Sequence, residues 1–163
     1  MSVIDTLITD RTQDDVDTFA KLAKMRWQDM SDAERATFNA GRGDYSADAM
    51  NRVGEAINYL VGRVNAAGGR IRDVEGKTDY AVTDYVTPAV ASEYLNTVIA
   101  ARGIFAVYPD TPAAPGTLAA LSYKSANDIE RILRDIDELI TKSQTMMYYS
   151  GDIYAGEVTT DEG

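Results

Sequence analysis

The chain contains neither cysteine nor histidine among its 163 residues. Without cysteine there is no disulfide, no thiolate nucleophile and no cysteine-ligated metal. Without histidine, the commonest general base and the commonest transition-metal ligand are both missing. These absences exclude cysteine and histidine chemistry, and we assign no catalytic residue, no metal ligand and no cofactor-binding residue.

Basic residues are also scarce, since 16 Lys and Arg stand against 26 Asp and Glu, for a net charge of −10. Residues 1–77 hold 11 basic and 13 acidic groups, whereas residues 78–163 hold 5 and 13. This acid excess argues against a nucleic-acid partner, because a phosphate backbone requires several Lys or Arg contacts. No run approaches the roughly 18 apolar residues of a membrane span, so we expect no membrane insertion. The first ten residues lack the features of a signal peptide.

Apolar residues recur every three or four positions in three long segments, a pattern that predicts amphipathic helices. They run from Ser46 to about Ala66, from Thr87 to Arg102, and from Ser125 onwards. The inward-facing residues are Met50, Val53, Ile57, Leu60, Val61 and Val64 in the first, Val90, Tyr94, Leu95 and Val98 in the second, and Ile129, Ile132, Leu133, Ile136, Leu139, Ile140 and Met147 in the third. We expect the first and last stripes to pack against each other.

Shorter elements are marked by their ends. Thr12 predicts a helix start that leads to about Met25 or Trp27, and a capping box at Ser31 predicts a short helix closed by Gly41. The alternation of polar and apolar residues in 70–74 predicts a short strand. Residues 118–121 are expected to form a single helical turn. A glycine at position 54, inside a predicted helix, suggests the close approach of another helix.

Two segments 79 positions apart resemble each other, Ser46–Val53 and Ser125–Ile132, and each carries an arginine at the same place, Arg52 and Arg131. The fold class we predict is mainly α: an internally duplicated helical bundle of two helix–connector–helix halves, with a short extended linker and an extended C-terminal tail. The predicted boundaries are 1–77 for the first repeat, 78–147 for the second, and 148–163 for the tail. We expect the two arginines to form ion pairs rather than to bind a substrate.

The tail is rich in tyrosine, glycine and acid, and Tyr149-Ser150-Gly151-Asp152 is echoed by Tyr154-Ala155-Gly156-Glu157. Tyrosine offers a large contact area with a polar tip, and an extended segment can add to a sheet edge in another chain. The alternative is that the tail folds back over its own domain. The candidate partner-contact residues are Tyr148, Tyr149, Ile153 and Tyr154.

Three other patterns suggest sites. Arg42, Gly43 and Asp44 form the tripeptide that integrin ligands display, although a glycine loop between helices explains it as well. Positions 44, 46, 48 and 55 match part of a calcium loop, but alanine stands where the loop needs its glycine. The neighbouring acids at 14–15 and 135–138 would suit a hydrolase only if they faced each other across a cleft, and solvated helix faces explain them better.

Several segments, in order and spread over most of the chain, resemble a family of small proteins encoded among the tail and host-attachment genes of phages and prophages of gut-type Gram-positive bacteria. They are 7–12 with Asp15-Val16, Trp27 with Met30 and Glu34, 45–48 with 51–56, 126–130, and 149–157. The chain departs from the family at Arg42–Tyr45, where such proteins often carry a Lys-Gly-Ala-Tyr-type loop.

This resemblance implies a non-enzymatic virion structural protein, made in the host cytoplasm. It would be an adaptor or building block of the tail tip, baseplate or fibre region, with other virion proteins and further copies of itself as partners. The alternative is a receptor-binding or adhesin module that uses the Arg42–Asp44 loop. A hydrolase is the least favoured class.

Overall fold

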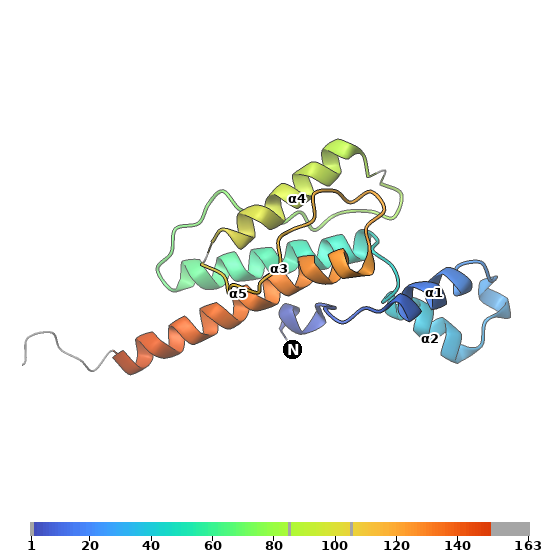
Figure 1. The fold of residues 1–163 in the computed structure, drawn as a ribbon, viewed down its shortest axis with the longest axis horizontal. Coiled ribbons are helices and arrows are strands. Elements are labelled where there is room, and N and C mark those ends of the chain that lie inside the picture. The colour runs from blue at the N-terminus through green and yellow to red at the C-terminus, as the bar shows by residue number, and fades with distance from the viewer. Residues whose placement is uncertain (1, 85, 105, 151–163) are drawn as a thin grey trace, which may run out of the picture.

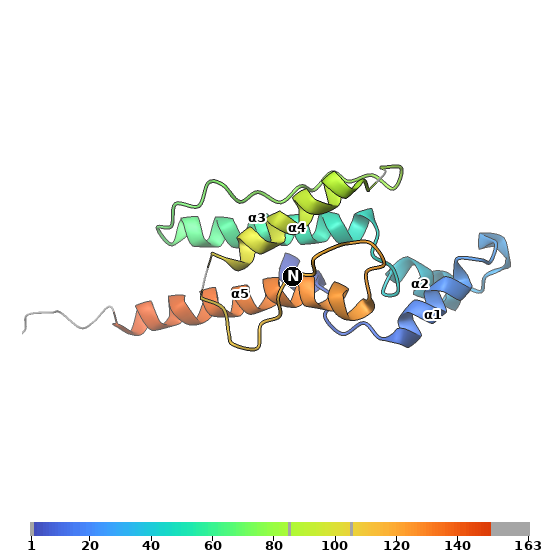
Figure 2. The same ribbon diagram turned by 45° about the horizontal axis from the view of Figure 1, so that its top comes forward.

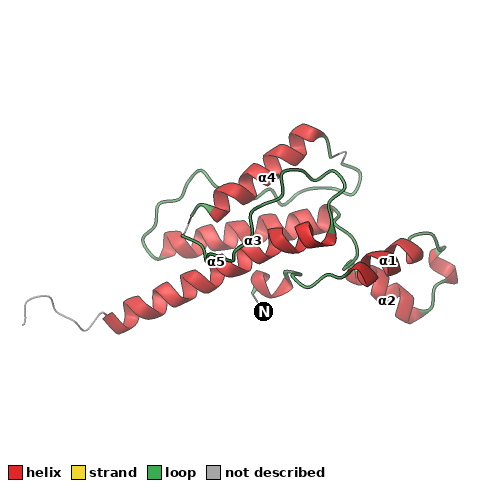
Figure 3. Cartoon of the chain, in the orientation of Figure 1, coloured by secondary structure: helices red, strands yellow, loops and turns green. Residues whose placement is uncertain are grey.

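The computed structural model describes residues 2–84, 86–104 and 106–150, with side chains in the last helix up to position 146. This part of the chain is mainly helical and contains no strand, so the strand predicted for 70–74 is wrong (Figure 3). The elements are η1 (Val3–Thr6), α1 (Gln13–Leu22), η2 (Trp27–Asp29), α2 (Asp32–Ala40), α3 (Ala47–Ala66), α4 (Pro88–Arg102) and α5 (Tyr123–Ser150).

Most helix ends follow the capping signals in the sequence. Thr12 and Ser31 each form a complete capping box, and Gly41 ends α2 in the left-handed conformation, at φ 60°. Thr87 caps α4, with proline in its first turn, and α4 ends at Arg102 as predicted. These local bonds satisfy amide groups that the helix itself leaves unpaired.

Several local details differ from prediction. Helix α1 stops at Leu22, a few residues early. Ser46 precedes α3 without a side-chain capping bond. Helix α5 begins two residues before Ser125, because the Ser122 hydroxyl accepts the Ser125 amide at 3.1 Å. Residues 118–121 form a turn, not the predicted helical turn.

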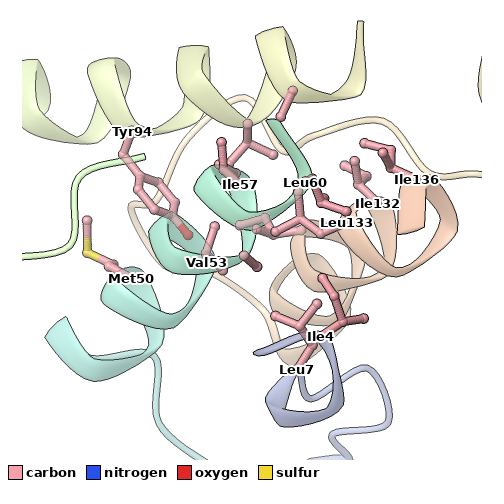
Figure 4. Close-up of a cluster of buried hydrophobic side chains, with 14 of the residues drawn as sticks. Ile4, Leu7, Met50, Val53, Ile57, Leu60, Tyr94, Ile132, Leu133 and Ile136 are labelled. Atoms are coloured by element: carbon pink, nitrogen blue, oxygen red, sulfur yellow. The ribbon is translucent and has the colours of Figure 1, made fainter. Parts of the chain in front are cut away.

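The predicted packing of the two long apolar stripes is confirmed. Helices α3 and α5 form the most extensive helix–helix interface, and α5 also contacts α4 and η1. Figure 4 shows the side chains of α3 facing those of α5, with η1 closing one side and Tyr94 of α4 the other. The fully buried aliphatic residues are Val53, Ile57, Leu60, Val98, Ile129, Ile132, Leu133 and Ile136. Each contributes about 1.5–3 kcal/mol through burial.

Helices α3, α4 and α5 all run in the same direction along the long axis of the molecule (Figure 1, Figure 2). Two long segments, 67–87 and 103–122, must therefore return along the body before the next helix can begin. Tyr80 of the first segment packs edge-on against Tyr94 of α4, with ring centroids 6.3 Å apart. The first returning segment thus contributes to the core beside α4.

Three asparagines on one face of α3 hold the returning segment 71–80. They are seven residues apart, about two helical turns, and each side-chain amide bonds both the N–H and the C=O of one residue. The pairs are Asn65 with Ile71, Asn58 with Gly76 and Asn51 with Tyr80, at 2.7–2.9 Å. The backbone N–H and C=O of these three residues are therefore paired with side chains of α3 and not with another strand.

The backbone that approaches Gly54 closely is the same returning segment. The prediction that another helix approaches Gly54 is therefore wrong. A Cβ at Gly54 would lie 2.0 Å from the Lys77 carbonyl oxygen. A Cβ at Gly76 would lie 2.2 Å from the Gly54 carbonyl oxygen. The two backbones touch directly, with no room for a side chain on either.

The α1–α2 hairpin (residues 13–40) projects from one end of the body, and α5 extends past α3 at the opposite end (Figure 1, Figure 2). The hairpin has its own small core, in which the rings of Phe19 and Phe38 stack with centroids 4.9 Å apart. Leu22 and Met30 are buried beside it.

The structure does not confirm the predicted duplication. Ser46 precedes α3, whereas Ser125 lies inside α5. Arg52 reaches a buried carboxylate, whereas Arg131 pairs with the exposed Asp110. A single core takes side chains from both 1–77 and 78–147. Residues 148–150, predicted as the start of an extended tail, continue α5, and 151–163 lie outside the described residues.

We predict opposite effects for two glycine substitutions in α3. Gly54→Ala should lower the free energy of unfolding by about 1–3 kcal/mol, because its methyl group would overlap the Lys77 carbonyl. Gly62→Ala, with nothing within 4 Å, should raise it by up to about 1 kcal/mol through helix propensity. Urea unfolding followed by circular dichroism measures both. Equal effects from the two substitutions would show that the backbone contact at Gly54 is not as tight as described.

Candidate functional site

A buried ionic cluster lies where the N-terminal segment, α3 and α5 meet. The side chain of Glu130 is fully buried. Its Oε1 accepts from Arg11 Nη2 at 2.6 Å and from Arg52 Nη2 at 2.9 Å. Its Oε2 accepts from the Ile8 amide at 2.5 Å and from Arg52 Nε at 3.3 Å. Four donors, two from the N-terminal segment and two from α3, thus converge on one carboxylate of α5.

The four hydrogen bonds to the Glu130 carboxylate limit the chemistry that this residue can perform. Both oxygens are fully engaged, and no solvent reaches them. A general base needs a free lone pair within reach of a substrate proton, and Glu130 offers none. The cluster is therefore a structural junction that fixes the N-terminal segment and α3 on α5. Since breaking one partner of such a cluster leaves uncompensated buried charge, its geometry is strongly enforced.

Two neighbours on α5 extend the junction along the N-terminal segment. Asn127 accepts from the Arg11 amide and donates to the Arg11 carbonyl, both at 3.0 Å. Arg134 donates to the Leu7 carbonyl at 3.1 Å and to the Thr9 hydroxyl at 2.8 Å. Residues 7–11 are thus held along one face of α5, and the asparagine repeats the mode of binding seen on α3.

Two tyrosine hydroxyls meet beside the cluster. Those of Tyr45 and Tyr94 lie 2.6 Å apart, and the Arg11 guanidinium carbon lies 5.7 Å from the centre of the Tyr45 ring. Arg11 Nε has no hydrogen-bond partner among the described residues, and the Tyr45 ring gives the guanidinium a cation–π contact. Burial raises the pKa of Tyr45. The pKa of Tyr94 is raised mainly by burial and, to a smaller extent, by the neighbouring Tyr45. Both hydroxyls stay neutral near pH 7.

The tripeptide loop is tied to its own domain through Arg42. The guanidinium donates to Asp10 at 2.9 Å and to Asp15 at 3.4 Å. Gly43 sits on α1, where a Cβ would lie 2.1 Å from the Asp15 carbonyl oxygen. Asp44 donates its amide to the Gly41 carbonyl in the same turn. To act as a receptor ligand, Arg42 would first have to leave both carboxylates, so this geometry does not favour the adhesin alternative.

The other acidic candidates are occupied by structural contacts or lie in regular helix. Asp15 caps α1, and hydrogen bonds from Thr12, together with the charge of Arg42, lower its pKa. Asp137 pairs with Arg63, and Asp135 accepts from the Thr111 hydroxyl at 2.5 Å. Asp48 lies in the first turn of α3 and not in a calcium loop. Across the described ranges, no three acids are grouped to hold a metal ion.

Of the candidate partner-contact residues, Tyr148 and Tyr149 lie in the last turn of α5, and Ile153 and Tyr154 lie outside the described residues. Helix α5 leads toward them as a projecting arm, because every residue from 141 to 146 is exposed and Met146 is 72% exposed. In the described chain, no helix is long and apolar enough to cross a membrane.

Sequence reasoning missed the exposed aromatic surface at the tip of the hairpin. Trp27 is 51% exposed, with Phe38 edge-on at 6.4 Å and the Arg35 guanidinium carbon 5.5 Å from its ring centre. Its backbone carbonyl also accepts from Arg35 Nε at 3.1 Å. The sequence feature that could have indicated this surface is the single tryptophan just beyond the apolar stripe of α1.

A groove of about 920 Å³ runs between the returning segment 73–79 and α4. Its lining is mostly polar and acidic, with Asp73, Glu75 and Glu93 among the residues. Glu130 and the tyrosine pair do not line it. The groove thus lacks the apolar lining with a few convergent polar groups that is typical of a small-molecule site.

Comparison of the chain with protein-family models, with curated proteins and with solved structures gave no match.

We predict that the carboxylate at position 130 dominates the stability of the junction. Glu130→Ala should lower the free energy of unfolding by about 3–5 kcal/mol, because it leaves the Arg11 and Arg52 charges without their partner. Glu138→Ala, which removes an exposed pair with Lys142 on the same helix, should leave the urea midpoint nearly unchanged. Similar midpoints for the two variants would contradict the role assigned to Glu130.

We also predict a loss of stability above about pH 10, where tyrosine ionises in an unfolded chain. Because the folded pKa values of Tyr45 and Tyr94 are raised, their contribution is complete below that pH and is lost as pH rises further. Thermal unfolding across pH 8–12 measures the loss. A Tyr45→Phe/Tyr94→Phe variant should lose less stability over this range. If its pH profile matches that of the unaltered chain, the tyrosine pair is not the cause.

Proposed function

We propose that this chain is a non-enzymatic structural protein of a phage particle, an adaptor or building block in the tail tip, baseplate or fibre region. The observation that carries the proposal is the division of the molecule into a locked body and two projecting ends with exposed apolar side chains, Trp27 on one and Met146 on the other. The resemblance of its segments to phage tail and host-attachment proteins supplies the setting.

The body has the properties of a spacer. Its apolar core supplies the driving force for folding, while the Glu130 junction and the asparagine contacts admit one arrangement of the N-terminal and returning segments. Buried ionic groups that accept a single geometry can favour specificity of structure over stability. A part that transmits position between neighbours in a particle needs this property.

The two ends have the properties of contact surfaces. Large aromatic side chains with a polar tip are enriched at protein interfaces, and a few of them carry most of the binding energy. Trp27 stands on the hairpin, and Tyr148 and Tyr149 follow the exposed arm of α5. We propose other virion proteins and further copies of this chain as the partners, in a symmetric assembly.

The test is incorporation into particles. Mass spectrometry of particles purified from the strain that carries the gene should find the chain at a constant copy number. Tyr149→Ala/Tyr154→Ala should reduce its incorporation about tenfold or more, because interface tyrosines contribute on the order of 1–2 kcal/mol each. Tyr59→Ala serves as the control, since it removes a partly exposed tyrosine of the body. Absence of the chain from particles, or normal incorporation of the double variant, would overturn the proposal.

A further inference from the structure

The tip of the hairpin carries exposed basic residues and an exposed tryptophan, on a protein whose net charge is −10. We define the Trp27 surface as Lys21, Lys24, Arg26, Trp27 and Phe38. The three cations are exposed, and none lies within ion-pair distance of an acid in the part of the chain that the structure describes. Residues 18–28 contain these three cations and no acid, although the net charge of the chain is −10.

Exposure of Trp27 marks this surface as one that a partner covers. A tryptophan buries roughly 150–250 Å² when it is covered, and tryptophan is the residue type most enriched among binding hot spots. Here it is 51% exposed on a projection, with Phe38 edge-on beside it and the Arg35 guanidinium over its ring. The partner should therefore bring aromatic or aliphatic side chains together with negative charge.

The C-terminal segment of this chain has that chemistry. Residues 151–163 contain four acids, no base, and the apolar pair Ile153 and Tyr154. They follow Tyr148 and Tyr149 at the end of α5. Residues 148–163 together thus carry three tyrosines and four acids with no base among them.

The distance along the molecule decides whether the C-terminal segment can reach Trp27 of its own copy or only that of another copy. Helix α5 has 28 residues, about 42 Å in length, and its C-terminal end lies at the opposite end of the molecule from the hairpin (Figure 1, Figure 2). Thirteen further residues span at most about 47 Å when fully extended. A tail that ran back along its own α5 would use its whole length before reaching Trp27. The tail of a second copy has no such limit.

We propose that the Trp27 surface of one copy binds the acidic, tyrosine-containing C-terminal segment (residues 148–163) of a second copy. The contact is head-to-tail, so a bound pair keeps one free surface on one copy and one free tail on the other, and repetition gives a ring or a filament. This inference deepens the proposed function by naming a partner, and it rests on the assembly role proposed above. It is tested on the purified chain, so it can fail while the chain still enters particles.

The experiment is a charge exchange in the full-length chain. Sedimentation velocity at low salt should show that the mass of the unaltered protein rises with concentration, and the fluorescence of Trp27, the one tryptophan of the chain, should change over the same range. Added salt should weaken the association. Lys24→Glu/Arg26→Glu should weaken it about tenfold or more, as should a variant in which lysine replaces Asp152, Glu157, Asp161 and Glu162. Combining the two sets in one chain should restore association.

The matched control is Arg70→Glu/Arg72→Glu, which makes the same charge change on exposed residues of the returning segment. It should associate like the unaltered chain. All variants alter residues outside the core, and circular dichroism verifies their folding. The proposal is overturned if the unaltered chain stays monomeric at several hundred micromolar, if the control weakens association equally, or if the combined variant does not recover.

Discussion

Parallel alignment of the three long helices is the constraint on which the rest of this structure depends. Antiparallel neighbours can be joined by a short turn, but helices that run the same way need connections as long as themselves. Those connections lie against the body, where each backbone N–H and C=O requires a partner. The chain meets this requirement with side chains. Asn51, Asn58 and Asn65 of α3 each bond one residue of the first connection through both of its backbone groups.

The N-terminal segment is held by the same principle with charge added. Asn127 bonds the backbone of Arg11 as its counterparts on α3 bond theirs, and Glu130 one turn later gathers Arg11, Arg52 and the Ile8 amide. Apolar burial between α3 and α5 drives folding, whereas these polar contacts choose which arrangement of the segments is adopted. These contacts thereby fix the part of the body from which the hairpin and the arm of α5 project.

Sequence reasoning recovered what local patterns determine. The stripes of Ile57 and Ile132 followed from helical periodicity, and the caps at Thr12, Ser31 and Thr87 followed from residue type and spacing. The roles of the asparagines and of Glu130 were missed, because their partners lie far along the chain, up to 122 positions away. An asparagine or a glutamate in a helix looks like a solvated residue until the opposing backbone is known. The apparent repeat failed for the same reason, since Arg52 and Arg131 share a sequence context but not a partner.

The long separation between Glu130 and its partners also bears on the order of events during synthesis. Arg11 leaves the ribosome early, yet its carboxylate is encoded 119 positions later, and that of Arg52 78 positions later. Until α5 is made, both cations and the Ile8 amide remain hydrated, and α3 has no helix on which to bury its stripe. Contacts this distant slow folding, because the intervening chain must be ordered before they form. Completion of the native body therefore waits for the last third of the chain, and the projecting arm of α5 emerges only after that point.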